Sequence, residues 1–245
     1  MSQDNQIKKI IIVGATSGIG RKMAELYAAE GHIVGITGRR KELLDDIENM
    51  FPEKIKTECF DVTGKENIDK LKALIKKIGG MDILVYSSGV GEPSKQLEWR
   101  IDKPVVDTHV NGFIEISNWS FNFFVAQGKG HLAVISSIAA NRGNSWAPAY
   151  AAAKAFQSIY YEGLAIKAER MRKKITVTAI EPGFVDTAMA HGGDKMFWIV
   201  PVEKAAKQII AGLKKKKRKL YVSKRWWLIA KLMRWMPFWI YKRFL

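Results

Sequence analysis

The feature that most constrains this chain is a repeated alternation between short apolar runs and helical patterns. Seven runs rich in β-branched residues cover residues 7–13, 32–37, 55–60, 83–86, 132–135, 175–180 and 220–222. Between them, apolar residues recur at helical spacing, for example over residues 21–30, 41–50 and 68–78. Parallel strands need crossover connections and are buried on both faces. The pattern therefore predicts one α/β domain over residues 1–222, a doubly wound fold with a seven-stranded parallel sheet.

Length and cysteine content agree with a domain that needs no covalent staple. A chain of 245 residues buries enough surface to fold without a disulfide or a structural metal. Cys59 has no partner within the chain, and the four histidines lack metal-ligand spacing, so no metal site is expected. The polar start MSQDNQ does not resemble a secretory signal, and no run of about 18 apolar residues occurs. These features indicate a cytoplasmic protein.

The net charge of +16 is concentrated at the end of the chain. Residues 214–245 contain twelve Lys or Arg and no acid, which leaves 28 basic and 24 acidic residues in the first 213. The same segment holds four of the eight tryptophans. The body is thus an ordinary, mildly basic domain, and the charge belongs to a basic, aromatic tail over residues 223–245 and the lysine run before it.

A glycine-rich turn separates the first apolar run from the first helical pattern. It consists of Gly14, Ala15, Thr16, Ser17, Gly18, Ile19 and Gly20. In a parallel sheet this turn lies at the carboxyl edge, where phosphates meet the N–H groups of a helix start. A side chain at the glycines would block a pyrophosphate or hold the helix away from the strand. The turn therefore predicts dinucleotide binding, as in a Rossmann-type fold.

The end of the second apolar run indicates which dinucleotide is bound. A carboxylate there binds the ribose 2′-OH of NAD, whereas a cation pairs with the 2′-phosphate of NADP. Arg39 and Arg40 follow this run, and no acid occupies the turn. Because guanidinium groups suit bidentate phosphate contacts, NADP(H) is favoured over NAD(H).

Tyr150 and Lys154 are four residues apart in an alanine-rich helical stretch, so both side chains lie on one face. A phenol is a poor proton donor at neutral pH, and a nearby ammonium lowers its pKa. Ser137 follows another apolar run, thirteen residues before Tyr150, and its hydroxyl is expected at the same edge of the sheet. These three side chains predict acid–base chemistry on a carbonyl or alcohol.

Together these motifs resemble the short-chain dehydrogenase/reductase family over residues 7–222. The glycine turn is similar to the family's TGxxxGxG, and Asn111, Ser137, Tyr150 and Lys154 follow the order of its catalytic tetrad. The resemblance implies that Tyr150 protonates the carbonyl oxygen and that Ser137 hydrogen-bonds to it. It also implies that Lys154 binds the nicotinamide ribose and depresses the Tyr150 pKa, and that Asn111 holds a water linking Lys154 to solvent.

The resemblance extends to further cofactor residues. Pro182 and Gly183, with Val185 and Thr187, resemble the PGxVxT segment beside the nicotinamide, and the pair Asp61–Val62 resembles the adenine contact. Two positions depart from the family pattern. The usual NNAG is replaced by residues 86–89, which read YSSG, so that Ser88 and Gly89 are expected at the cofactor, and Val13 stands where threonine is common.

The sequence of the tail predicts an amphipathic helix, which Pro237 divides into two pieces. Tryptophans on one side and Lys or Arg on the other are typical of helices in an anionic membrane interface. An oligomer interface or a lid over the substrate pocket suits the same pattern, and nucleic acid is the least favoured partner.

The resulting expectation is an NADPH-dependent reductase of hydrophobic, lipid-like ketones or aldehydes, assembled as a homodimer or homotetramer. The loop over residues 186–201, with Met189, Met196, Phe197 and Trp198, is expected to close over the substrate. The alternative is a non-catalytic NADPH-binding sensor or scaffold, held at a membrane surface by the tail, because a fold alone does not secure an activity.

Overall fold

A seven-stranded parallel sheet forms the centre of the protein, as the alternation of apolar runs predicts. The computed structural model describes residues 6–92, 94, 96–188 and 197–243. The strand order is β3-β2-β1-β4-β5-β6-β7. The strands are β1 (Lys9–Val13), β2 (Ile33–Gly38), β3 (Ile55–Cys59), β4 (Ile83–Tyr86), β5 (Lys129–Ile135), β6 (Lys174–Pro182) and β7 (Lys219–Val222).

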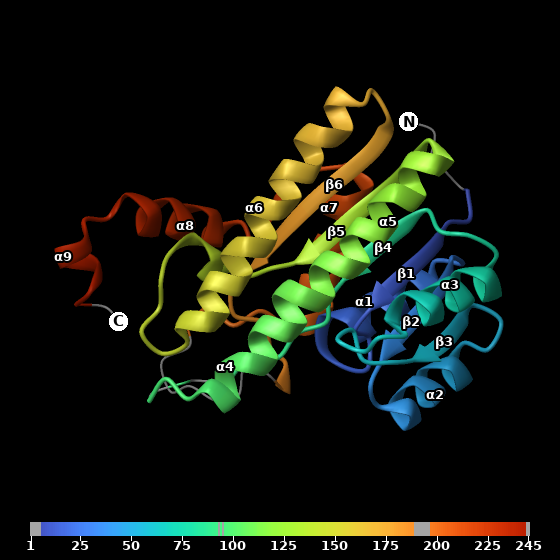
Figure 1. Ribbon diagram of the computed structural model, residues 1–245, viewed down its shortest axis with the longest axis horizontal. Coiled ribbons are helices and arrows are strands. Elements are labelled where there is room, and N and C mark those ends of the chain that lie inside the picture. Colours follow the sequence, from blue (N-terminus) through green and yellow to red (C-terminus); the bar gives the residue numbers. More distant parts are fainter. Residues whose placement is uncertain (1–5, 93, 95, 189–196, 244–245) are drawn as a thin grey trace.

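Helices cover both faces of the sheet (Figure 1). One face packs against α1 (Gly18–Ala29), α2 (Lys41–Met50) and α7 (Val202–Lys214). The other packs against α3 (Asn67–Ile78), α5 (Phe113–Gln127) and α6 (Pro148–Arg170). The remaining helical elements are α4 (Trp99–Val106), the π-helix η1 (Asp107–Gly112), the 3-10 helix η2 (Ile138–Asn141), α8 (Arg225–Trp235) and α9 (Phe238–Tyr241). This three-layer arrangement is the doubly wound α/β fold expected from the sequence.

The strand order reverses beside β1, and this reversal positions the site. Val13 at the end of β1 is in register with Thr37 of β2 on one side and with Tyr86 of β4 on the other. The loops that follow these three strands therefore leave the sheet at the same level. Crevices at such a switch point, beyond the carboxyl ends of the strands, are where α/β sheets bind ligands.

The tail forms the two helical pieces expected from Pro237. Helix α8 begins at Arg225, and α9 follows Pro237. In Figure 1 both extend away from the sheet, on the side where α6 begins. Among the described residues, no helix is both long and apolar enough to span a bilayer.

Candidate active site at the carboxyl edge of the sheet

The glycine turn packs so closely that side chains would not fit. Gly14 has φ +87°, and a Cβ placed on it would lie 2.5 Å from the backbone of Ser88. A Cβ on Gly20 would lie 2.2 Å from the carbonyl oxygen of Gly14, so this glycine lets α1 approach the turn. The loop after β4 thus supports the turn after β1, although it lacks the family's asparagines. Both glycines have the steric reason expected from the sequence.

The start of α1 offers unneutralised positive charge. Ser17 is the N-cap but makes no side-chain cap hydrogen bond, and the first turn carries no acid. Arg40 donates hydrogen bonds to Thr16 Oγ1 (2.5 Å) and Ser17 Oγ (3.0 Å), so its guanidinium lies against the same turn. A helix N-terminus with free N–H groups and a neighbouring guanidinium is suited to a phosphate. The turn therefore fits the pyrophosphate of a dinucleotide.

Arg39 and Asp61 face each other across the ends of β2 and β3. Their side chains are 3.6 Å apart, and that of Arg39 is 63% exposed. Val62 is buried, and its carbonyl oxygen accepts a hydrogen bond from Asn67 (2.8 Å). Asn67 therefore holds the loop that is expected to contact adenine, and the Arg39 side chain beside this loop is exposed to solvent.

The segment after β6 lies between the glycine turn and the tail. Thr187 approaches Gly18, on which a Cβ would meet the threonine methyl at 3.3 Å. Val185 forms an isolated parallel bridge with Val200. Gly183 has no room for a side chain, because a Cβ there would lie 1.9 Å from the indole of Trp226. The segment expected beside the nicotinamide thus contacts the first turn of α1 through Thr187 and α8 through Gly183. Met189 and Met196, expected in the loop over the substrate, lie outside the described residues.

Ser137, Tyr150 and Lys154 come together where β5 ends and α6 begins. Ser137 is the N-cap of η2, and its hydroxyl accepts a hydrogen bond from Ala139 N (3.1 Å) and bonds to the Tyr150 phenol. Lys154 Nζ lies 5.6 Å from the centre of the Tyr150 ring, one helical turn along α6. The spacing of the two residues on a helix therefore brings them together as the sequence predicts.

The Lys154 ammonium is buried and is held by two acceptors. It donates hydrogen bonds to Ile135 O (2.9 Å) and Gln157 Oε1 (3.2 Å). Burial lowers the pKa of Lys154 to about 7. Burial also raises the pKa of Tyr150, and only the hydrogen bond from Ser137 opposes this rise. The depression of the Tyr150 pKa by Lys154, expected from the resemblance, is not seen here, because the ammonium is itself partly neutralised and is bonded to other groups.

His109, rather than Asn111, lies beside the Tyr150–Lys154 pair. Asn111 is exposed, and its amide donates to Asp107 (3.1 Å) on its own helix, so it does not join the cluster. His109 is fully buried, and its ring packs edge-on against Tyr150 with centroids 5.6 Å apart. Burial, and then the charge of Lys154, lower the pKa of His109 well below its ordinary value. The role assigned to Asn111 therefore needs correction, because residues two apart on a helix face different directions.

A directed chain of hydrogen bonds connects Lys154 to this histidine. Gln157 accepts from Lys154 through Oε1, and its Nε2 donates to His109 O (3.1 Å) and lies 3.4 Å from His109 Nδ1. His109 Nε2 lies 2.7 Å from Val90 O and accepts a hydrogen bond from Val90 N (3.2 Å), so both backbone groups of Val90 face this nitrogen. Gly89 makes room for the ring, since a Cβ there would lie 2.8 Å from His109 Cε1. The loop after β4 therefore holds the histidine ring in place.

Sequence reasoning missed His109, although a signal was present. Buried residues on this stretch recur at helical spacing as Val105, His109, Gly112, Phe113 and Ile116. That stripe places His109 on the face that packs against the sheet and α6. The π-helix Asp107–Gly112 contains the residue, and such insertions often occur at functional sites.

An aromatic wall joins the tail to the site, and it includes Phe197 and Trp198 of the loop that is expected to close over the substrate. Trp226 packs against Phe184, Phe197 and Trp198, with ring centroids 5.4–6.1 Å apart. Trp226 is only 2% exposed and contacts Ile138, which follows Ser137. Its indole N–H has no hydrogen-bond partner among the described residues. The tail is therefore part of the wall around the expected nicotinamide segment.

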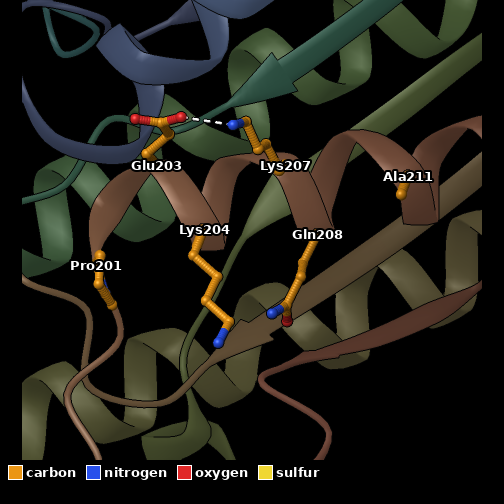
Figure 2. A pocket seen from close by; sticks show the side chains of 6 residues that line it. All are labelled: Pro201, Glu203, Lys204, Lys207, Gln208 and Ala211. Carbon is orange, nitrogen blue, oxygen red and sulfur yellow. Dashed lines mark hydrogen bonds and ion pairs between the residues drawn. The ribbon is translucent and has the colours of Figure 1, made fainter.

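A hollow lies on the outer side of α7, away from these residues. It has a volume of about 540 Å³ and is lined by Pro201, Glu203, Lys204, Lys207, Gln208 and Ala211. Figure 2 shows the ion pair between Glu203 and Lys207 on one side of the helix and Lys204 and Gln208 on the other. Helix α7 and its N-cap residue Pro201 supply all the lining residues, so the hollow is an open surface feature. The described residues contain no cluster of His, Cys, Asp or Glu that could hold a metal.

Comparisons with known proteins agree with this geometry. The family model for short chain dehydrogenases matches residues 8–196. An uncharacterized oxidoreductase of Mycobacterium tuberculosis (strain CDC 1551 / Oshkosh) is 29% identical over 238 residues, covering 94% of this chain and 92% of the relative. An uncharacterized oxidoreductase of Staphylococcus aureus (strain USA300) is 33% identical over 186 residues, covering 74% of this chain and 80% of the relative.

Solved structures show the same fold. A short-chain dehydrogenase from Burkholderia cenocepacia J2315 in complex with NADP has a TM-score of 0.83 at 17% identity, covering 99% of both chains. A 3-ketoacyl-(acyl-carrier-protein) reductase from Brucella melitensis complexed with NADH has a TM-score of 0.80 at 23% identity, covering 88% of this chain and 96% of that one. With the matched family model and the assembled site, these comparisons show that the chain belongs to the short-chain dehydrogenase family and is an NAD(P)-dependent oxidoreductase.

Proposed function

We propose that the protein reduces a hydrophobic ketone or aldehyde with NADPH, with Tyr150 as the proton donor. The observation that carries the proposal is the meeting of Tyr150, Ser137 and Lys154 at the carboxyl edge of the sheet, beside the glycine turn. The nearby turn has the glycines, helix start and guanidinium that a dinucleotide requires. The unpartnered indole N–H of Trp226 beside Gly183 fits the same cofactor, whose carboxamide offers an acceptor.

The protein side chains handle the oxygen of the substrate. Ser137 and Tyr150 hydrogen-bond to the carbonyl oxygen, where negative charge develops and preorganised donors stabilise most strongly. NADPH, when bound, supplies the hydride that the carbonyl carbon accepts. Tyr150 transfers its phenolic proton to the oxygen, which completes the alcohol. Because the pKa of Lys154 is about 7, this side chain can exchange a proton at neutral pH and return the phenol to its acid form.

The hydrogen bonds that run from Lys154 through Gln157 and His109 to Val90 orient the lysine for this proton exchange. Gln157 holds the ammonium through its amide oxygen, and His109 fixes the orientation of that amide. His109 is uncharged at neutral pH, since its pKa is lowered well below the ordinary value. We assign Gln157 and His109 as positioning residues that keep Lys154 within reach of the cofactor ribose and the phenol.

Two features support the finer specificity. The end of β2 carries Arg39 and Arg40 and no acid, which favours the 2′-phosphate of NADPH over the ribose hydroxyl of NADH. The aromatic wall of Phe184, Phe197, Trp198 and Trp226 supports an apolar substrate. Homodimer or homotetramer assembly and a cytoplasmic location belong to the same proposal. Contact of residues 223–245 with an anionic membrane surface is a separate proposal.

The test is cofactor consumption with NADPH and NADH against carbonyl compounds of increasing chain length. We expect turnover that favours NADPH and rises with chain length. In Tyr150→Phe, turnover falls at least about 1,000-fold while NADPH binding is kept, because only the proton donor is removed. Tyr160→Phe is the matched control, since this tyrosine lies on the same helix and its hydroxyl bonds to Asn118.

Two results would contradict the proposal. Unchanged turnover in Tyr150→Phe would remove Tyr150 from its role. Tight NADPH binding by the wild-type protein without turnover of any carbonyl in the series would favour the non-catalytic sensor instead.

A further inference from the structure

One side of the tail is fixed to the body of the protein. Trp226 and Ala230 of α8 are buried against Ile138 and its neighbours. Arg142, from the loop after η2, donates to the carbonyl oxygens of Met233 and Met236 at the end of α8. Its guanidinium also lies 4.3 Å from the ring centre of Tyr241, whose hydroxyl donates to Gly143 O (2.8 Å). The tail is therefore an ordered platform that is attached to the segments around the site.

The opposite side of the tail is apolar and exposed. Its members are Trp227, Leu228, Leu232, Trp235, Phe238 and Trp239, with exposed fractions from 47% for Trp227 to 84% for Trp235. We call this set the outer face. Large apolar side chains that gather on one ordered surface mark an interaction site more often than scattered single ones do. Phe197, Trp198 and Ile199 are each about half exposed and extend the apolar surface toward the aromatic wall.

The charges around the outer face determine its partner. Six exposed cations accompany it, namely Lys224, Arg225, Lys231, Arg234, Lys242 and Arg243, and no acid occurs after Glu203. Lys231 stacks over Trp227 at 4.1 Å, so cations and aromatics are interleaved. A second copy of this face would bring two cationic sets together, which is unfavourable. Nucleic acid would satisfy the cations but would leave most of the apolar side chains in water.

We propose that the outer face docks on an anionic lipid bilayer with the aromatic wall turned toward it, so that an apolar carbonyl compound enters from the lipid. Aromatic and leucine side chains enter the boundary between headgroups and acyl chains, while the cations pair with anionic headgroups. Trp226 and Trp227 are adjacent on α8, so one lines the site while the other meets the lipid. The entry route rests on the proposed reductase activity, whereas the docking face does not.

The first test measures co-sedimentation of the full chain with vesicles. Binding to equal parts phosphatidylcholine and phosphatidylglycerol should be at least about tenfold stronger than to phosphatidylcholine alone, and salt should weaken it. The double variant Trp235→Ser/Trp239→Ser should lower the partition coefficient about tenfold or more, because two interfacial aromatics are lost. In the control Ile7→Ser/Met50→Ser, which changes two exposed apolar residues far from the tail, binding should be unchanged. Equal binding by wild type and tail variant would overturn the docking face.

A second pair of variants separates this face from general charge attraction. Lys231→Glu/Lys242→Glu should abolish binding to the anionic vesicles. Lys215→Glu/Lys217→Glu makes the same change in net charge on exposed lysines before β7. This variant should keep most of the binding to the anionic vesicles. Equal loss in both would overturn the proposal in favour of non-specific attraction. Tighter binding to a DNA duplex than to the vesicles would likewise overturn it.

Turnover tests the entry route. Anionic vesicles should raise kcat/KM severalfold for a long-chain carbonyl dissolved in the bilayer and leave that for a short, water-soluble carbonyl unchanged. The rise should disappear in Trp235→Ser/Trp239→Ser, while its turnover of the short compound stays at the wild-type level. Vesicle binding without this rise would overturn the entry route. Vesicle binding without turnover of either compound would instead contradict the reductase proposal and leave the docking face standing.

Discussion

The two halves of the carboxyl edge reach their function by different physical means. In the half at the ends of β1 to β3, which we propose binds the nucleotide, glycines keep side chains away from the backbone and from the N–H groups of the α1 start. In the half at the ends of β4 to β7, where we propose catalysis, buried polar groups hold one another through a chain of hydrogen bonds. The first half should therefore be sensitive to added volume and indifferent to pH. The second should respond to loss of hydrogen bonds and to protonation.

The largest effect on cofactor affinity is expected from added volume in the first half. Gly14→Ala should weaken NADPH binding at least about 100-fold, because the methyl group would collide with the Ser88 backbone and φ is +87°. Gly31→Ala separates collision from backbone strain, since Gly31 has φ +88° and open space around its Cβ position. The control should lose about 1 kcal/mol of stability and keep its NADPH affinity. Titration calorimetry and thermal unfolding measure both; equal affinity losses would mean that strain alone matters.

The buried charge of Lys154 should make stability depend on pH. Its pKa is about 7 in the folded protein and near 10.4 in an unfolded chain. Below pH 7 the group is protonated in both states, so the folded protein bears the full cost of the buried ammonium. Between pH 7 and 10.4 the unfolded chain holds more protons, so stability rises with pH, by up to a few kcal/mol.

Lys154→Met removes this dependence and keeps most of the side-chain volume. The difference in unfolding free energy between variant and wild type should therefore change in favour of the wild type as pH rises from 7 to 10. Denaturant titrations at several pH values measure it. Parallel curves for the two proteins would show that the lysine keeps an ordinary pKa.

The hydrogen bonds that link Lys154 to Gln157 and His109 should affect turnover and leave cofactor binding unchanged. Gln157→Leu removes the acceptor of the ammonium and the donor to His109, and kcat should fall about 10- to 30-fold with a shifted pH profile. NADPH affinity should stay within about twofold, because the glycine turn is untouched. Gln127→Leu is the control, since this glutamine donates to Met81 O and Lys129 O far from the site. A kcat loss of the same size in the control, or an unshifted profile in Gln157→Leu, would reduce Gln157 to a packing residue.

The sequence predicted the sheet and most of its helices because hydrophobic periodicity depends on local spacing. It predicted the cluster of Tyr150, Lys154 and Ser137 for the same reason, since a helical turn and a strand end fix their positions. It did not place Asn111 correctly, because a π-helix and the buried stripe through His109 decide which side chain faces α6.

Local sequence patterns did not predict the contacts of the tail either. The position of Trp226 over Gly183 joins residues 43 positions apart, and only tertiary packing brings them together. The sequence predicts tryptophans on one side of the tail and Lys or Arg on the other, whereas α8 carries apolar residues on its buried side and on its exposed side. Which tryptophan turns inward and which outward depends on the shape of η2 and of the loop around Arg142.

The smallest expected effect distinguishes two neighbours within the nucleotide-binding half. Arg39 is mostly exposed beside Asp61, whereas Arg40 is bonded to Thr16 and Ser17 of the turn. Arg39→Ala should raise the NADPH Kd about tenfold, the effect of one lost phosphate contact, and leave the NADH Kd within about twofold. Arg40→Ala should weaken both cofactors alike, by about three- to fivefold, because it loosens the turn that both share. The reverse pattern in fluorescence titrations would assign the 2′-phosphate to Arg40 and leave Arg39 a surface residue paired with Asp61.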